Sequence, residues 1–248
     1  MVDILSQAEI DALLAALDGG APAAAPVADP RPALATHRNQ VVKNYDFRRP
    51  DKFSKDQIRA LHMIMENFSR SWGTFLSGKL HSLVYLELNS IDQMTYEEFL
   101  QSLSSPTVIA VFSLAPLEGS ALLEINANLA FTMIDRLLGG TGRSMGITRE
   151  LTEIEAAIMG GIVSDTWSYL RTALKDIVPV NPRLEGLECN PQFVQIVPPG
   201  DMVLFISISM RIGDVRDILV FCFPFLLLEP ILSKLNTQQF FAVRRETE

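Results

Sequence analysis

The side chains that most often carry catalysis are sparse in this sequence. Its three histidines are His37, His62 and His81, and its two cysteines are Cys189 and Cys222. Neither cysteine has a partner at metal-ligand spacing, and no Cys–His nucleophile arrangement is indicated. His62 and His81 fall on one predicted helix, but their spacing does not place them on one face with a pair of carboxylates. We therefore expect structural histidines, no catalytic residues, no metal and no other cofactor.

A glycine-rich stretch, LLGGTGRSMG at residues 137–146, invites comparison with nucleotide-binding loops. Its spacing does not fit, because no Gly-Lys-Ser/Thr follows and the third glycine of a dinucleotide loop is missing at the required offset. The stretch also follows a predicted helix, whereas a phosphate-binding loop follows a strand. Two interpretations stay open from the residues alone. It is either a helix C-cap with a flexible loop, or an exposed contact loop where only glycine lets a partner approach.

The composition describes a protein with a large apolar core and an acidic surface. The chain has 248 residues, is 48% hydrophobic and carries a net charge of −8, which argues against nucleic acid as a partner. Residues 1–20 lack the features of a signal peptide. The most apolar run, residues 218–228, is too short to span a bilayer and contains Pro224, so it predicts a buried strand that continues into a helix. Two unpaired cysteines are typical of a reduced, cytosolic protein.

Two long helices are predicted by capping boxes, in which a Ser or Thr and a Glu or Gln three residues later satisfy each other's backbone N–H groups. The first box is Ser54 with Gln57, and an apolar face from Ile58 to Leu76 follows it. The second is Thr152 with Glu155, followed by an apolar face that we expect to include Ile154, Ile158, Ile162 and Leu170, with Trp167 nearby.

The same order of elements follows each long helix. A single strand comes first (84–88 and 183–189), then a strand pair (108–114 with 121–126, and 203–210 with 217–223), then an apolar closing helix (129–138 and 225–235). The pairs are expected to turn at Glu118-Gly119 and at Gly213-Asp214. The halves are thus one module repeated at an offset of about 95 residues. We expect an α/β fold over residues 45–238, with pseudo-two-fold symmetry and one central sheet covered by helices on both faces.

The N-terminal stretch LSQAEIDALLAALDGG (5–20) predicts a separate amphipathic helix within residues 1–18. Ser6 and Glu9 form its capping box, and Gly19 and Gly20 end it. Its apolar stripe consists of Ile10, Leu13, Leu14 and Leu17. Residues 19–44 are rich in Ala, Pro and Gly and predict a flexible linker, and residues 239–248 a C-terminal tail. Such a helix either docks into a partner's apolar groove or packs on its own domain.

Four segments resemble the flagellar motor switch family FliM: LSQAEIDALL (5–14), YDFRRPDKFSKDQ (45–57), GGTG (139–142) and NPQFVQIVPP (190–199). The resemblance implies a middle domain similar to the CheC phosphatases and a protein that acts in chemotaxis without catalysis. It also implies copies side by side in a ring on the cytoplasmic face of the inner membrane, in the flagellar basal body.

Two binding sites are implied by the resemblance. The N-terminal helix would bind the phosphorylated response regulator CheY through Ile10, Asp11, Leu13 and Leu14, and the predicted set is completed by Ser6, Glu9 and Leu17. The glycine loop would contact the rotor protein FliG, through Gly139, Gly140, Thr141, Gly142 and Arg143. Members of the family also carry a C-terminal domain similar to FliN. This sequence stops at RRETE, so we expect assembly with FliN only where the full protein has that domain.

The alternative function is a phosphatase acting on the same regulator. The phosphatases that the middle domain resembles place a Glu and, three residues later, an Asn on each long helix. An alignment through the two tryptophans puts Glu66 and Ser69 at these positions on the first helix, and Gly161 and Ser164 on the second. Both carboxamides and one carboxylate are therefore missing, which argues against this alternative.

Overall fold

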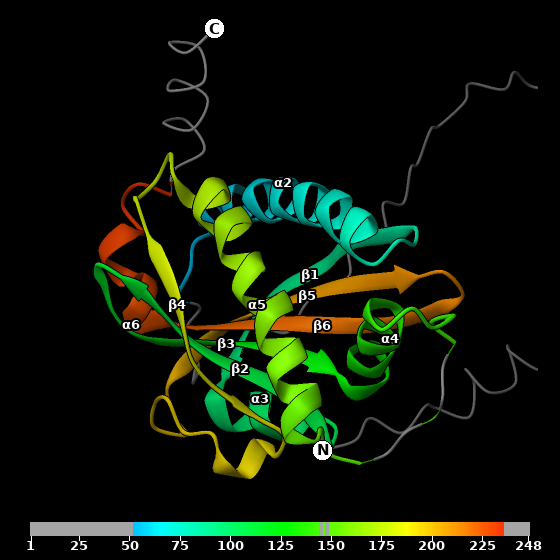
Figure 1. Cartoon of the computed structure of the whole chain (residues 1–248). Coiled ribbons are helices and arrows are strands. Elements are labelled where there is room, and N and C mark those ends of the chain that lie inside the picture. The colour runs from blue at the N-terminus through cyan, green and yellow to red at the C-terminus, as the bar shows by residue number, and fades with distance from the viewer. Residues whose placement is uncertain (1–51, 144–145, 147–148, 236–248) are drawn as a thin grey trace, which may run out of the picture. The chain divides into compact units, whose positions relative to one another are not determined.

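The computed structural model describes residues 52–143, 146 and 149–235, all of which belong to one unit of the chain, Phe47–Glu248. Its centre is an antiparallel sheet in the order β1-β5-β6-β3-β2-β4 (Figure 1). The strands are β1 (Val84–Thr95), β2 (Thr107–Ala115), β3 (Leu117–Asn126), β4 (Asn181–Glu188), β5 (Met202–Ile212) and β6 (Val215–Pro224). The predicted helix within 1–18, the linker 19–44 and the tail 239–248 lie outside the described residues.

The strand order confirms the predicted internal symmetry. Replacing each strand by its counterpart in the other half, β1 by β4, β2 by β5 and β3 by β6, gives the same order read backwards. The two halves therefore share one sheet, and its pseudo-two-fold axis passes through the central β3–β6 pair.

Both long helices begin where the capping boxes predict. In α2 (Lys55–Lys79), the Gln57 backbone N–H donates to Ser54 Oγ at 3.3 Å, and the Ser54 N–H donates to Gln57 Oε1 at 2.8 Å. In α5 (Glu153–Leu174), Thr152 and Glu155 exchange the same two bonds. Each box satisfies backbone donors of the first helical turn that have no partner within the helix. The local sequence thus fixes where both helices begin.

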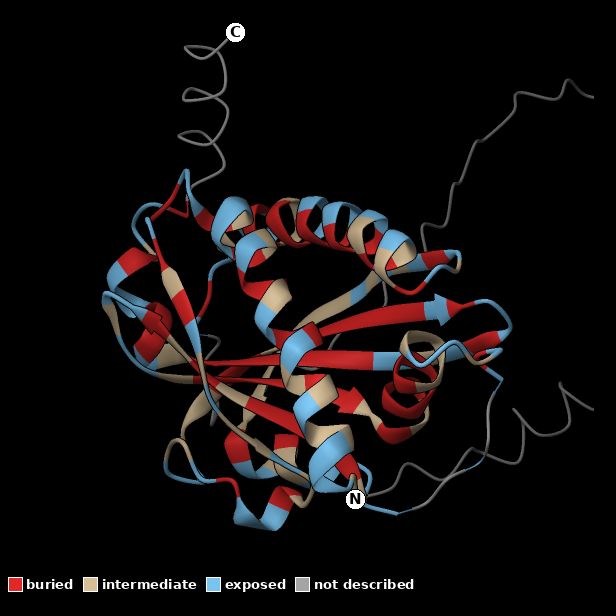
Figure 2. Ribbon diagram, in the orientation of Figure 1, coloured by how far each residue is buried: buried red, intermediate tan, exposed pale blue. Residues whose placement is uncertain are grey.

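The main core lies between one face of the sheet and the helices α2, α5 and α4 (Ala127–Leu137). Figure 2 shows the buried sides of these helices turned toward the strands. Aromatic rings connect the helices to the sheet. The ring centroids of Phe68 in α2 and Phe221 in β6 are 5.5 Å apart, and those of Phe112 in β2 and Trp167 in α5 are 4.5 Å apart. These contacts bind the two halves of the repeat into a single core.

A short helix, α3 (Tyr96–Ser102), covers part of the opposite face together with the 190–201 segment. The Tyr96 hydroxyl donates to the Val194 carbonyl at 2.9 Å, and the Tyr96 backbone N–H donates to the Asp201 carbonyl at 2.9 Å. Burial raises the pKa of Tyr96 to about 12. These bonds hold the NPQF segment, with its 3₁₀ turn η1 (Pro191–Phe193), against the sheet. The prediction of helices on both faces is therefore confirmed.

Several predicted boundaries are wrong for local reasons. The strand expected at 84–88 runs on to Thr95 through a bulge between Leu88 and Ser90. The first hairpin turns at Ala115-Pro116, because Leu114 pairs with Leu117, and the turn predicted at Glu118-Gly119 lies inside β3.

The second half departs from the prediction in two further places. The closing helix expected over 225–235 is reduced to α6 (Phe225–Leu228) and the 3₁₀ turn η2 (Glu229–Ile231), because Pro230 cannot donate a helical hydrogen bond. Ile154, expected on the buried face of α5, is 75% exposed, since it lies in the first turn beyond the edge of the core.

Candidate functional site

The glycine loop begins as a close continuation of α4. The Gly139 N–H donates to the Arg136 carbonyl at 3.1 Å, and the Gly140 N–H donates to the Asp135 carbonyl at 2.7 Å. Gly139 has φ +88°, a conformation that favours glycine at the end of a helix. The first residues of the loop are thus a helix C-cap, which is one of the two interpretations that the sequence allows.

Two further glycines leave space for side chains of α4 itself. A Cβ on Gly140 would lie 2.1 Å from Asp135 Oδ1, and a Cβ on Gly142 would lie 2.4 Å from Arg136 Cδ. The Asp135 carboxylate accepts a 2.7 Å hydrogen bond from the Gly142 N–H, and Gly142 has φ +67°. The positive φ favours glycine at residue 142, and at residue 140 a larger residue would displace the Asp135 carboxylate. A partner's approach is not needed to explain these glycines.

Arg136 ties this loop to a distant part of the chain. Its guanidinium donates to the Gly140 carbonyl (3.3 Å), to the Leu80 carbonyl (3.2 Å) and to the His81 carbonyl. The last two belong to the turn between α2 and β1. One charged side chain thus satisfies three carbonyl groups from two segments, and charge-assisted bonds of this kind are stronger than neutral ones.

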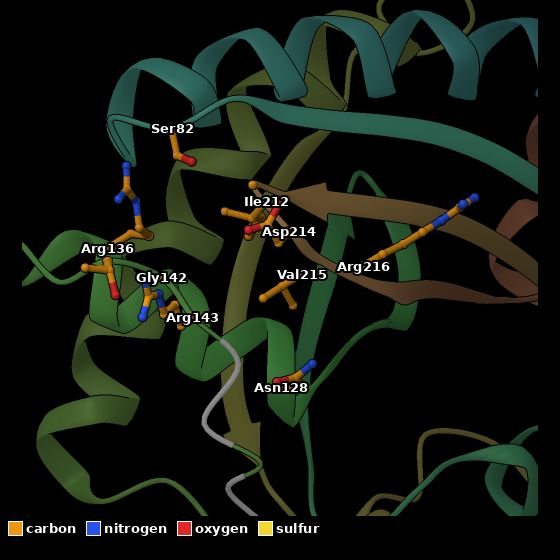
Figure 3. A pocket seen from close by; sticks show the side chains of 11 residues that line it. Ser82, Asn128, Arg136, Gly142, Arg143, Ile212, Asp214, Val215 and Arg216 are labelled. Atoms are coloured by element: carbon orange, nitrogen blue, oxygen red, sulfur yellow. The ribbon is translucent and has the colours of Figure 1, made fainter.

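A pocket of about 690 Å³ opens beside the loop. It is lined by Ser82 of the α2–β1 turn, Asn128 and Arg136 of α4, residues 141–143 of the loop and residues 212–216 of the β5–β6 hairpin (Figure 3). Ile212 and Val215 are buried, at 1% and 6% exposure, and Figure 3 shows them beside Asp214 in the middle of the pocket. The pocket therefore combines an apolar base with a polar rim.

The charges around this pocket are mixed. Arg136 and Arg143 approach from the α4 side, and Asp214 from the hairpin. The Arg216 side chain runs away from the other lining residues in Figure 3, and its Nε donates to Ser209 Oγ at 3.2 Å. A protein surface with a mixed-charge rim would fit this arrangement better than a small anion.

The two cysteines and His62 do not line this pocket, and the predicted regulator-binding residues lie outside the described part of the chain. Cys222 is buried, and burial raises the pKa of its thiol; Cys189 is partly buried. His62 is half-exposed on α2, 3.5 Å from a single carboxylate, that of Glu66. The predicted regulator-binding residues are Ser6, Glu9, Ile10, Asp11, Leu13, Leu14 and Leu17.

Catalytic and metal chemistry gain no support from the described residues. Among them, no three His, Cys, Asp or Glu side chains gather as a metal site would require. Residues 142–146 read G-R-S-M-G and match the G-x-S-x-G spacing of hydrolases. In those enzymes the serine follows a strand, whereas this stretch follows helix α4, so the match does not indicate a nucleophile.

At the positions aligned with the phosphatases, the carboxamides are missing and one of the serines is buried. Ser69 is 2% exposed, and its hydroxyl has no hydrogen-bond partner within the described structure. It therefore cannot reach a phosphoryl group on another protein. Glu66, Gly161 and Ser164 are exposed, but they include only one acidic group and no carboxamide.

Comparison with known proteins decides the family. The family model of the flagellar motor switch protein FliM matches residues 54–240. The chain belongs to the FliM family. FliM of Treponema pallidum is 42% identical over the whole chain, which covers 70% of that relative, and FliM of Thermotoga maritima is 42% identical over the whole chain, which covers 73% of it.

A solved structure of the family agrees with the fold described above. The FliM chain in a FliG–FliM complex from Helicobacter pylori is 37% identical, with a TM-score of 0.71, and the match covers 73% of this chain and 99% of that one. The sequence-based recognition as a FliM switch protein is thus confirmed. No described helix of this FliM is both long enough and apolar enough to cross a bilayer.

The glycine loop is visible in the sequence, but the residues that hold it are not. Asp135 and Arg136 carry no motif, and the partners of Arg136 lie 55 and 56 residues away in the sequence. The only local signal is a charged pair at the end of an apolar helix, which is ordinary at a helix terminus.

Proposed function

We propose that this FliM binds FliG through the loop formed by Gly139, Gly140, Thr141, Gly142 and Arg143, and so controls the direction of flagellar rotation. The observation that carries this proposal is an exposed loop, held by hydrogen bonds to α4, beside a pocket in a chain whose relative was solved in complex with FliG. Thr141 and Arg143 are exposed, while the glycines are fixed by Asp135 and Arg136. A preorganised loop loses little conformational entropy on binding.

Titration of FliG into the full chain tests this proposal. We expect saturable binding with one site per chain, measured by isothermal titration calorimetry. A Thr141→Trp variant should weaken binding without a change in melting temperature, because residue 141 is exposed. Absence of binding by the wild-type chain would reject the proposal.

The N-terminal segment supplies the second proposed contact. We assign residues 1–18 to a helix that binds phosphorylated CheY, residues 19–44 to a flexible linker, residues 45–238 to the middle domain and residues 239–248 to a tail. The four-residue apolar stripe and the capping box support this assignment. A short helix that folds on binding spends interaction energy on ordering, so we expect roughly micromolar affinity for each tail.

A peptide of residues 1–20 allows this contact to be tested separately. We expect it to bind CheY more tightly when beryllofluoride mimics the phosphoryl group. Equal affinity for both forms of CheY would show that the helix does not distinguish the phosphorylated regulator. The middle domain of the same chain would then be the next binding partner to test.

The protein acts by binding and does not catalyse dephosphorylation. The buried Ser69 and the missing carboxamides support this part of the proposal. Copies placed side by side in a ring at the cytoplasmic face of the membrane would raise the local concentration of captured regulator. A turnover assay with phosphorylated CheY should show only its spontaneous decay rate; faster decay would restore the phosphatase alternative.

A further inference from the structure

We infer that the FliG-binding surface extends beyond the glycine loop to the α2–β1 turn, and that Leu83 and Leu138 are its apolar contacts. This inference rests on the proposed function, since it describes the same partner at the same end of the domain. It assigns Arg136 as the positioning residue that holds the two segments in one arrangement.

The first step is the connection between the segments. The Arg136 guanidinium donates to the Gly140 carbonyl on one side and to the Leu80 and His81 carbonyls on the other. His81 has φ +46°, a conformation that non-glycine residues rarely adopt. Its carbonyl accepts one of the arginine's hydrogen bonds. The loop and the turn are thus fixed relative to each other by a single side chain.

The second step links the turn to the far wall of the pocket. The Gly213 N–H, in the β5–β6 hairpin, donates to the Leu83 carbonyl at 3.2 Å. The same hairpin supplies the base of the pocket through Ile212 and Val215. Loop, turn and hairpin are therefore three neighbouring parts of one surface, joined by hydrogen bonds from Arg136 and Gly213.

The third step is the exposure of two leucines next to the residues that make these bonds. Leu83 is 69% exposed and lies two residues after His81; Leu138 is 72% exposed and lies two residues after Arg136. Both are therefore close in sequence to the bonds that fix the loop and the turn. A partner that contacts the loop and the turn would cover them, and removing large apolar side chains from water favours association.

The pocket indicates what the partner would present. Its base is apolar and its rim carries Arg143 and Asp214. The matching segment of FliG would insert an apolar side chain and place polar groups of both signs around it. Burial of the two leucines would then continue the apolar contact toward α2.

The test compares Leu83→Ser and Leu138→Ser in the full chain, with FliG affinity and melting temperature as readouts. Each change should raise the dissociation constant about tenfold, because each removes one large apolar contact. Melting temperatures should stay at the wild-type value, since both side chains are exposed. Leu226→Ser is the matched control, because Leu226 is 61% exposed on α6, in the other half of the repeat. This variant should bind FliG with the wild-type affinity.

Arg136→Met tests the positioning role by hydrogen–deuterium exchange. Exchange should rise both in residues 80–83 and in residues 139–143, with weaker FliG binding. Faster exchange in the loop alone would overturn the assignment of Arg136.

The remaining outcomes separate this inference from the function on which it rests. Wild-type binding of FliG together with unchanged binding by both leucine variants would overturn the inference and leave the proposed function standing. Failure of the wild type to bind FliG would reject the proposed function itself. If Leu83→Ser changed only the self-association of the chain, measured by sedimentation velocity, the leucines would face a second copy, and the inference would be wrong.

Discussion

Leu123 of β3 and Phe221 of β6 lie directly opposite each other in the central strand pair. They also occupy the same place in the two halves of the repeat, because Phe221 follows Leu123 by 98 residues, the same interval that separates the capping residues Ser54 and Thr152. The pseudo-two-fold axis therefore passes through this pair. Both side chains are fully buried, so the join between the halves is part of the core.

Phe221→Ala should be among the most destabilising single changes in the middle domain. The ring contacts Phe68, Phe112 and Phe223, which belong to both halves. We expect a loss of about 3–5 kcal/mol in the free energy of unfolding, measured by urea titration. Leu226→Ala, at an exposed site, should change it by less than about 0.5 kcal/mol. Equal effects of the two changes would contradict a shared core.

Glu124 should make the domain less stable as pH rises toward neutrality. Burial raises the pKa of this carboxyl from 4.5 to about 7, although a 2.5 Å hydrogen bond from Thr107 Oγ1 opposes the shift and Asp217 adds to it. Between these values the folded state binds more protons than the unfolded state, so the free energy of unfolding falls as pH rises. The full effect is roughly 3–3.5 kcal/mol, reached above pH 7.

Glu124→Gln tests this directly, because the amide has the same shape and no charge. The variant should be more stable than the wild type at pH 8 and nearly equal at pH 4, by chemical denaturation at each pH. Glu87→Gln, at an exposed position of β1, is the control and should keep the wild-type pH dependence. A Glu124→Gln variant that still lost stability between pH 5 and pH 7 would show that another group is responsible.

Gly140→Ala should impair FliG binding more than folding. The new Cβ would displace the Asp135 carboxylate, and the Gly142 N–H would lose its 2.7 Å hydrogen bond. We expect about a tenfold loss of affinity by calorimetry, with a fall of only a few degrees in melting temperature. Gly161→Ala, in open space on α5, should bind normally and be more stable by about 0.5–1 kcal/mol. Precipitation of Gly140→Ala would mean that the loop is needed for folding.

Ile10→Ala and Leu14→Ala should each weaken CheY binding by roughly tenfold or more, because both belong to the apolar stripe of the N-terminal helix. The melting temperature of the whole chain should not change, since the helix is proposed to dock on a partner. A lower melting temperature would show instead that the helix packs on its own domain. Ala12→Gln, on the helix face opposite the stripe, is the control and should bind as the wild type does.

The symmetric framework of this domain is predictable because its signals are local. Capping boxes mark where both long helices begin, and alternating apolar residues mark the paired strands. Helix α3 is not predicted, although Thr95 and Glu98 form a fourth capping box of the same kind, with Phe99 buried behind it. This signal is present in the sequence. It is recognisable as the start of a helix only when the strand before it is known to run to Thr95 and not to end at residue 88.

The binding surface is less predictable because its key bonds are not local. Nothing near Arg136 indicates that its guanidinium reaches the carbonyls of the α2–β1 turn. The glycines of the loop are evident in the sequence. The reason that glycine suits residues 140 and 142 is not, because it depends on how Asp135 and Arg136 pack against the loop. The exposure of Leu83 and Leu138 is not predictable either, because it depends on how the ends of α2 and α4 are placed relative to the sheet.

The second half of the repeat, with its shortened closing helix, has no counterpart of the glycine loop. Pro230 stops α6 after Leu228, and residues 236–248 contain no glycine, so the glycine loop occurs in one half of the repeat only. A duplicated subunit with two such loops could cross-link its rotor partners into a branched network. With one loop, the proposed contact would make each copy monovalent toward FliG, so this contact would not branch the assembly.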